Sequence, residues 1–332
     1  MLFDTRAVFG ANQVLAGYPG YAKLEKEGKL AQKVAEANAM FKECELCPRQ
    51  CGANRLIGEN GFCNAPAHPM VYSAHPHYGE EVSLVGKKGS GTIFFSNCNL
   101  RCVFCQNWPI SIKGYGKEYT NEGLADIMIH LQKIGCHNIN LVTPTHVMPN
   151  ILSAVRLAFM KGLRLPLVYN TSGYERVEVL RILDGIVDIY LPDMKFMDTD
   201  MADTYFPEAS DYPEVAQKAI IEMHRQVGIH LADSEGVAVR GLMLRHLVMP
   251  NRIAGTKTFI EWVAENLPKS TYLNIMHQYA PAYKAFDYPE ISRRITVQEY
   301  LAAMQWAAEY GLSNLDPHSV LIKKFYLKEL KG

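Results

Sequence analysis

From residue 92 onward, the chain alternates short apolar segments typical of strands with longer segments of helical periodicity. Strands that alternate with helices form a parallel sheet, because each helix connects one strand to the next. Right-handed connections curl such a sheet toward a barrel, and six units are too few for a closed eight-stranded barrel. The alternation therefore predicts an α/β fold, an open partial (β/α)6 barrel of parallel strands. Its six predicted strands are residues 92–96, 138–142, 165–169, 187–191, 241–248 and 271–276.

Local signals divide the chain further. Thr120 is a predicted helix cap, and Thr296 with Glu299 has the pattern of a capping box. Residues 1–43 have helical apolar spacing, whereas residues 44–91 are rich in cysteine, glycine and proline, where we expect metal-bound loops and irregular or extended chain. The predicted parts are 1–91 (N-terminal helix and four-cysteine metal module), 92–311 (barrel) and 312–332 (a tail packed on the barrel).

The balance of charge argues against two kinds of partner. The chain has 34 lysine and arginine residues and 34 aspartate and glutamate residues. A chain without net positive charge has no global field that recruits nucleic acid or an anionic membrane. We therefore expect neither partner.

The eight cysteines are clustered, and none follows Cys136 in the chain of 332 residues. Disulfide frameworks suit short secreted chains, so clustered thiols in a longer chain indicate metal sites in a reducing compartment. No apolar run approaches the ~20 residues of a membrane-spanning helix. The first residues lack the basic and apolar regions of a signal peptide. We therefore expect a cytoplasmic protein.

Cys98, Cys102 and Cys105 follow the first predicted strand in the sequence Cys-Asn-Leu-Arg-Cys-Val-Phe-Cys. A closed structural site takes four ligands, whereas three thiolates can hold three irons of a [4Fe–4S] cluster and leave the fourth iron free. That free position can bind a substrate, which makes the cluster a candidate catalyst. The alternative is a zinc site that a histidine or Cys136 completes.

A second set of thiols, Cys44, Cys47, Cys51 and Cys63, has the spacing Cx2Cx3Cx11C. Four thiolates close a site, so this set is expected to be structural. Thiolates suit both zinc and an auxiliary [4Fe–4S] cluster, and both remain open. Free buried thiols are the weakest interpretation of this set. Cys136 stands beside a predicted helix end and is expected to be a plain buried thiol.

All six predicted strands end in polar or turn-forming residues, and parallel sheets place active sites at this carboxyl edge. His146, Lys195 and Tyr279 are the candidate catalytic residues, although each also suits a structural role. His75 and His77 are placed to reach the same edge or to remain solvated. The candidates by strand are Thr143, Thr145 and His146 after the second, Asn170 and Thr171 after the third, Asp193 and Lys195 after the fourth, and His277, Gln278 and Tyr279 after the sixth.

The Cx3Cx2C triplet with Phe104 between its last two cysteines resembles the radical SAM superfamily. The resemblance implies a [4Fe–4S] cluster whose free iron binds S-adenosylmethionine (SAM), on a partial (β/α)6 barrel. It also implies the reaction: an electron from the cluster breaks the S–C5′ bond of SAM, and the resulting 5′-deoxyadenosyl radical abstracts hydrogen from a substrate. An electron donor such as flavodoxin or ferredoxin is implied as a partner, and Phe104 is expected near the adenine or in the core.

Three stretches resemble the glycyl-radical-enzyme activases, such as pyruvate formate-lyase activating enzyme. They are Cys-Val-Phe-Cys-Gln-Asn107, Asn170-Thr-Ser-Gly-Tyr174 and Asp193-Met-Lys195. The N-terminal Cys-x2-Cys-Pro-Arg-x-Cys-Gly block resembles a less characterised, activase-like branch. The first hypothesis is therefore hydrogen abstraction from a glycine of a protein substrate. The others are radical modification of another peptide or a small molecule, and an iron–sulfur electron-transfer or scaffold protein.

The resemblance also implies a set of cofactor-binding residues, with two departures from the activase pattern. A Thr143-Pro-Thr145 loop replaces the glycine-rich motif that holds the SAM amino group. Activases bind a monovalent cation through an aspartate and a threonine after the third strand and an aspartate after the fourth, but Asn170 replaces the first aspartate, which predicts weaker cation binding. The implied residues are Phe104, Asn107, Thr143, Thr145, Asn170, Thr171 and Asp193.

Overall fold

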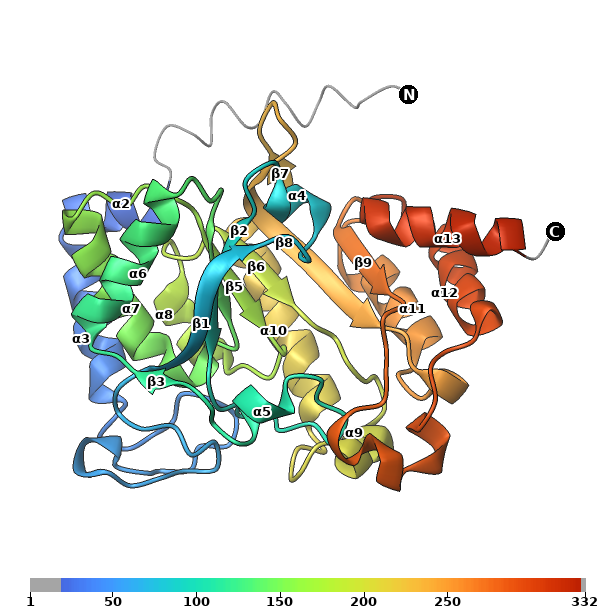
Figure 1. The fold of residues 1–332 in the computed structure, drawn as a ribbon, viewed down its shortest axis with the longest axis horizontal. Helices are drawn as coiled ribbons and strands as arrows, with labels where there is room; N and C mark the ends of the chain where they lie inside the picture. Colours follow the sequence, from blue (N-terminus) through green and yellow to red (C-terminus); the bar gives the residue numbers. More distant parts are fainter. Residues whose placement is uncertain (1–18, 330–332) are drawn as a thin grey trace.

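The structure is a computed structural model that describes residues 19–329. Its central sheet has the strand order β3-β1-β2-β4-β5-β6-β8-β7, with β9 paired to β8 (Figure 1). The strands are β1 (Met70–His77), β2 (Ser90–Phe95), β3 (Lys117–Glu118), β4 (Ile139–Val142), β5 (Leu167–Thr171), β6 (Ile189–Pro192), β7 (Leu231–Ala232), β8 (Ala238–Leu247) and β9 (Tyr272–Met276).

Six strands, β2, β4, β5, β6, β8 and β9, pair in parallel in that order. They correspond to the six strands predicted from the sequence. In the described part of the chain no pairing joins β9 back to β2, so the barrel stays open. The predicted α/β partial barrel is confirmed.

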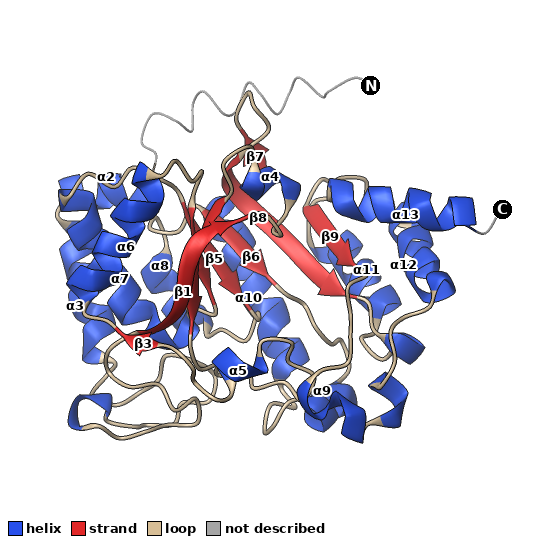
Figure 2. Ribbon diagram, viewed as in Figure 1, coloured by secondary structure: helices blue, strands red, loops and turns tan. Residues whose placement is uncertain are grey.

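Helices surround the outer face of the sheet, with α2, α3, α6 and α7 at the left of Figure 2 and α11, α12 and α13 at the right. Within residues 19–329, none has both the length and the apolar character needed to cross a bilayer. The helices are α2 (Gly20–Lys26), α3 (Lys29–Ala39), α4 (Val82–Val85), α5 (Trp108–Ser111), α6 (Asn121–Lys133), α7 (Met148–Met160), α8 (Val177–Leu183), α9 (Thr199–Tyr205), α10 (Tyr212–Val227), α11 (Thr256–Asn266), α12 (Val297–Glu309) and α13 (Pro317–Glu329).

The predicted helix caps are present. The Thr120 side chain accepts a hydrogen bond from the Gly123 backbone at the start of α6, and the Thr296–Glu299 capping box starts α12. The predicted N-terminal helix is divided into α2 and α3 by Gly28, which has a left-handed φ of 71°. Residues 1–18 of that prediction lie outside the described residues.

Several elements were not predicted, namely strands β1, β3 and β7 and helices α4, α5, α9 and α13. Strand β1 lies in the segment expected to be irregular or extended, and it pairs antiparallel with β2. Its sequence, Met-Val-Tyr-Ser-Ala-His-Pro-His, lacks a clean apolar alternation, so the sequence pattern did not indicate a strand. The segment is a strand because it pairs with β2. Helix α13 forms the tail, where Ser319 Oγ accepts a hydrogen bond from the Ile275 backbone of β9 at 3.1 Å.

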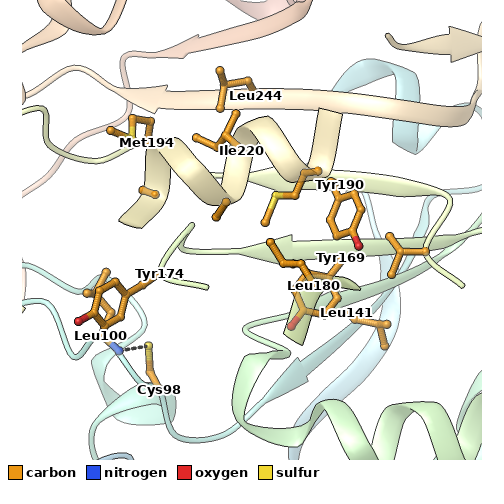
Figure 3. Close-up of a cluster of buried hydrophobic side chains, with 14 of the residues drawn as sticks. Cys98, Leu100, Leu141, Tyr169, Tyr174, Leu180, Tyr190, Met194, Ile220 and Leu244 are labelled. Atoms are coloured by element: carbon orange, nitrogen blue, oxygen red, sulfur yellow. Dashed lines mark hydrogen bonds between the residues drawn. The ribbon is translucent and has the colours of Figure 1, made fainter. Parts of the chain in front are cut away.

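The two faces of the sheet differ in character because successive strand side chains point to opposite faces. The main core lies between the sheet and the helices and includes Leu141 and Tyr169 (Figure 3). On the other face, Leu191 and Met243 join a smaller apolar cluster that α4 completes with Leu84. Two residues after Leu191 and Met243, the same face carries the charged side chains of Asp193 and Arg245. The interior of the barrel therefore changes from apolar to charged toward the carboxyl edge.

A buried carboxylate, Asp188, joins the N-terminal helices to the sheet. Its two oxygens accept hydrogen bonds from the backbone N–H groups of Gly20 and Leu167, both at 3.0 Å. Burial raises the pKa of Asp188 to about 7, although both backbone donors oppose this shift. The contact spans distant parts of the sequence and fixes where α2 begins.

Replacing Asp188 with alanine is expected to lower the free energy of unfolding by about 2 kcal/mol or more, because two buried N–H groups lose their acceptor. Urea denaturation measures the change. Asp126→Ala is the control, since its carboxylate pairs with Lys161 at an exposed position and should leave stability nearly unchanged. Equal losses in both variants would contradict this account.

Candidate active site

The cysteine triplet lies in a tight loop that leaves the carboxyl end of β2. Two non-glycine residues of this loop, Asn97 (φ 73°) and Arg101 (φ 57°), have left-handed backbone conformations. Strained conformations of this kind cluster at functional sites. The loop turns back so that the Leu100 N–H donates to Cys98 Sγ at 3.4 Å, the dashed line in Figure 3. A backbone donor favours the thiolate, which is the form that binds metal.

The thiols of the triplet lie in surroundings that fit a cluster. Burial raises the pKa of Cys98 and of Cys102, and the positive charge of Lys195 opposes that shift in both. Cys105 Sγ lies 3.1 Å from Ser111 Oγ at the end of α5. Within residues 19–329, no three His, Cys, Asp or Glu side chains are grouped as ligands of one metal ion. A [4Fe–4S] cluster places each thiolate on a different iron, so it does not require such convergence.

A cavity of about 260 Å³ opens beside this loop, at the carboxyl ends of β6, β8 and β9. This is where a parallel barrel places its active site. Four of its residues, Gln106, Arg245, Leu247 and Met276, were not predicted as site residues. Among the predicted residues, the cavity brings together Cys102, Phe104, Cys105, Asn107, Asp193, Lys195, Gln278 and Tyr279.

An ionic network forms one wall of the cavity. Asp193 accepts a hydrogen bond from Arg245 Nε at 2.7 Å and from Lys195 Nζ at 2.6 Å. Although burial raises the pKa of Asp193, these two cations hold it below its usual value. Burial lowers the pKa of Lys195, but the combined attraction of Asp193 and Cys102 and the hydrogen bond to Asp193 raise it above its usual value. The network therefore keeps all three groups charged away from bulk water.

Arg245 takes up two residues that the activase resemblance assigned to a monovalent cation. Besides Asp193, its guanidinium donates to Asn170 Oδ1 at 2.6 Å. The third residue of that set, Thr171, donates instead to the buried Glu175 carboxylate. A guanidinium therefore supplies positive charge between the strands. The available signal was a charged residue within the otherwise apolar stretch Gly-Leu-Met-Leu-Arg-His-Leu of β8.

The loop after β4 contributes no residue to the lining of the cavity. Thr143 has a left-handed φ of 59°, and its N–H donates to the Asn170 carbonyl at 2.9 Å. Thr145 is buried, and its hydroxyl donates to Glu175 Oε1 at 2.5 Å. Burial raises the pKa of Glu175 to about 7, while the hydroxyls of Thr145 and Thr171 oppose that shift. The structure gives these threonines contacts within the protein, and their predicted cofactor contacts stay predictions.

His75, His77 and His146 do not line this cavity either. His146 is buried with Nε2 at 2.7 Å from the Ser96 carbonyl oxygen, and burial lowers its pKa to about 4. The rings of His75 and His77 lie against Phe94 of β2, each with a centroid distance of 5.8 Å. Catalytic roles for these histidines therefore remain predictions without a contact in the cavity.

The second set of thiols forms a module beside the triplet loop, seen as the blue loops at the lower left of Figure 1. Arg49 Nε donates to the Asn99 carbonyl at 3.1 Å, and Arg101 NH1 donates to the Phe62 carbonyl at 2.9 Å. Two arginines, one from each segment, thus join the module to the loop. Burial raises the pKa of Cys44, Cys47 and Cys63, and charge on neighbouring thiols of the set contributes to each shift.

Comparison with known proteins identifies the class. Residues 92–230 match the family model of the Radical SAM superfamily, so the segment that contains the triplet and the first four parallel strands carries the match. Residues 92–230 therefore form a Radical SAM superfamily domain, and the protein is an enzyme of the class that uses SAM and a [4Fe–4S] cluster. Enzymes of this class need a reductant.

The chain is also similar to two archaeal proteins. It is 33% identical over 297 residues to uncharacterized protein MJ0674 of Methanocaldococcus jannaschii, an alignment that covers 86% of this chain and 80% of the relative, and the two belong to one family. It is 26% identical over 289 residues to uncharacterized protein MJ0808 of the same organism, covering 78% of each.

Solved structures show more distant similarity. A radical SAM methyltransferase from Sphaerobacter thermophilus aligns with a TM-score of 0.47 and 16% identity, over 67% of this chain and 64% of that one. A methylornithine synthase aligns with a TM-score of 0.43 and 11% identity, over 87% of this chain and 77% of that one.

Replacing Arg245 with methionine is expected to lower the free energy of unfolding by about 3 kcal/mol, because Asp193 then keeps only Lys195 as a partner for its buried charge. Adding Asp193→Asn to that variant should cost less than Asp193→Asn alone costs in the wild type, since the charge is no longer stranded. Chemical denaturation of the two single variants and the double variant measures this coupling. Strictly additive losses would contradict a shared network.

Proposed function

We propose that this enzyme abstracts a hydrogen atom from an organic substrate in the cavity beside Cys102 and Cys105. The observation that carries the proposal is the position of that cavity: it joins the triplet loop to the charged carboxyl ends of β6 and β8. Cys98, Cys102 and Cys105 would hold the [4Fe–4S] cluster. When bound, the cluster and SAM supply the radical that abstracts hydrogen.

The protein's own residues position the reactants and limit access of water. Phe104 packs with its ring centroid 5.8 Å from Phe196 and 6.2 Å from Tyr279, so one wall of the cavity is aromatic. Asp193, Lys195 and Arg245 give the cavity a charged wall, and their fixed charges can orient the amino and carboxylate groups of SAM. Phe104, Asn107 and Asp193 are the cofactor-binding residues that we propose from this cavity.

The proposed substrate is, first, a glycine residue of a partner protein, as in the glycyl-radical activases. Three stretches of sequence support it, and the Asn170–Arg245 contact marks a difference from that branch. The alternative is radical modification of another peptide or a small molecule. In either case, a flavodoxin or a ferredoxin is the proposed electron donor.

For the second set of thiols we propose a metal site, occupied by zinc or by an auxiliary [4Fe–4S] cluster. The mutual influence of the four thiols supports a shared site. One zinc ion would need all four sulfurs to converge on it. A cluster tolerates wider separation of the sulfurs, and both metals stay open for this site.

Anaerobic reconstitution with iron, sulfide, reductant and SAM should yield 5′-deoxyadenosine from the wild type. The triple variant Cys98→Ala, Cys102→Ala, Cys105→Ala should lose this product completely, because no thiolate remains to hold the cluster. Cys136→Ala is the matched control and should retain it, since Cys136 lies outside both sets. Product at background level in the wild type would overturn the proposed reaction. A glycyl radical signal in a co-purified partner would support the first substrate, and its absence across candidate partners would favour the alternative.

Metal analysis of the same triple variant identifies the second site. About four remaining irons per chain are expected if the module holds an auxiliary cluster, and one zinc if it holds a structural ion. Neither metal after reconstitution would contradict a second site.

The contacts of Arg245 predict that SAM cleavage needs no added K⁺ or Na⁺, because a guanidinium already lies between Asn170 and Asp193. Steady-state assays in tetramethylammonium buffer should give the same KM for SAM with and without added KCl at about 0.1 M, which is near physiological ionic strength. A large fall in KM on adding K⁺ would show that the activase cation site persists.

A further inference from the structure

A second cavity of about 320 Å³ adjoins the first along the open side of the barrel. Arg245, Met276 and Gln278 line both cavities, so the two cavities are neighbours. The far wall comes from Glu80 and Glu81, in the loop between β1 and α4. A group held in the second cavity therefore lies next to the cavity in which we place the cofactor.

The second cavity contains more acid than its neighbourhood neutralises. The side chains of Glu80 and Glu81 are buried, at 9% and 3% exposure, and they lie 3.6 Å and 3.8 Å from Arg245 NH1. The shorter contacts of Arg245 are with Asp193, which also pairs with Lys195. Three carboxylates thus share two cations, and a buried carboxylate without a partner is costly.

Glu81 has one oxygen that is available to a ligand. Its Oε1 accepts a hydrogen bond from Asn274 Nδ2 at 3.0 Å, whereas its Oε2 has no hydrogen-bond partner among residues 19–329. Burial and the adjacent Glu81 raise the pKa of Glu80 to about 8, so a proton can offset the excess charge when no other cation is present. Two histidines also line the cavity. Burial and the charge of His318 lower the pKa of His277, and His318 lies with its Nδ1 3.5 Å from Asp316 Oδ1, so it pairs with a different carboxylate.

We propose that this cavity binds a primary ammonium group on a short aliphatic part of the substrate, with Glu80 and Glu81 as its partners. An ammonium is a compact charge with three donors, which suits two adjacent carboxylates. A metal ion fits less well, since no three ligand side chains converge in the described residues. The inference rests on the proposed function, because it places the carbons attached to the ammonium beside the site of hydrogen abstraction.

Titration calorimetry of the reconstituted enzyme with butylammonium chloride tests the proposal, with 1-butanol as the neutral analogue. We expect butylammonium to bind and 1-butanol not to bind. Glu81→Gln should weaken butylammonium binding at least tenfold, whereas Glu118→Gln, on an exposed strand, should leave it unchanged. Asn274→Lys places a tethered ammonium beside Glu81 and should abolish binding, which keeps the test decisive if Glu81→Gln does not fold.

Equal binding of butylammonium by the wild type, Glu81→Gln and Asn274→Lys would overturn the proposal, and so would displacement of butylammonium by equimolar KCl. N-acetyl-lysine N-methylamide identifies the source of the ammonium: tighter binding than butylammonium indicates a peptide side chain, and weaker binding indicates a small amine. Absence of butylammonium binding with intact 5′-deoxyadenosine formation would overturn this inference alone. Loss of 5′-deoxyadenosine formation with intact binding would overturn the proposed function alone.

Discussion

The ion pair between Arg245 and Asp193 is the interaction on which the active edge of the barrel depends. It joins β8 to the end of β6, where the two residues also form an isolated parallel bridge. The same guanidinium reaches Asn170 at the end of β5, so one side chain connects three strand ends. Because these charges are buried, losing one would leave the others without a partner at a high cost in free energy. The network therefore fixes the spacing between the carboxyl ends of the strands.

That network also explains why the two cavities have different characters. On the side of the triplet loop, Lys195 completes the pairing of Asp193, and the aromatic ring of Phe104 covers the opposite wall. On the other side, Arg245 NH1 lies 3.6 Å from Glu80 and 3.8 Å from Glu81, farther than from Asp193. One arginine thus balances the cofactor side and leaves the neighbouring side acidic. The proposed sites of radical generation and of substrate recognition thus lie on two sides of one wall, which Arg245, Met276 and Gln278 form.

Much of the site could be predicted because its residues stand next to strands that the sequence reveals. Asp193, Lys195 and Tyr279 follow predicted strands and do line the cavity. Thr145 and His146 also follow a predicted strand, yet they are buried against other parts of the protein. A residue's position after a predicted strand indicates that it lies at the carboxyl edge of the sheet. Whether its side chain faces the cavity depends on what packs against the loop. For these two residues, the buried Glu175 and the end of β2 determine that direction.

The sequence by itself determined the parallel barrel, the triplet loop and the chemistry of its thiols, because periodicity and ligand spacing are local properties. Only the tertiary structure revealed Arg245 as the centre of the site, and the acidic cavity beside it. Arg245 is a mid-strand residue whose role comes from Asn170 and Asp193 on other strands. Glu80 and Glu81 precede the barrel in sequence and reach it only because β1 pairs with β2. Contacts between distant segments have no local signal, so folding alone decides which charges meet.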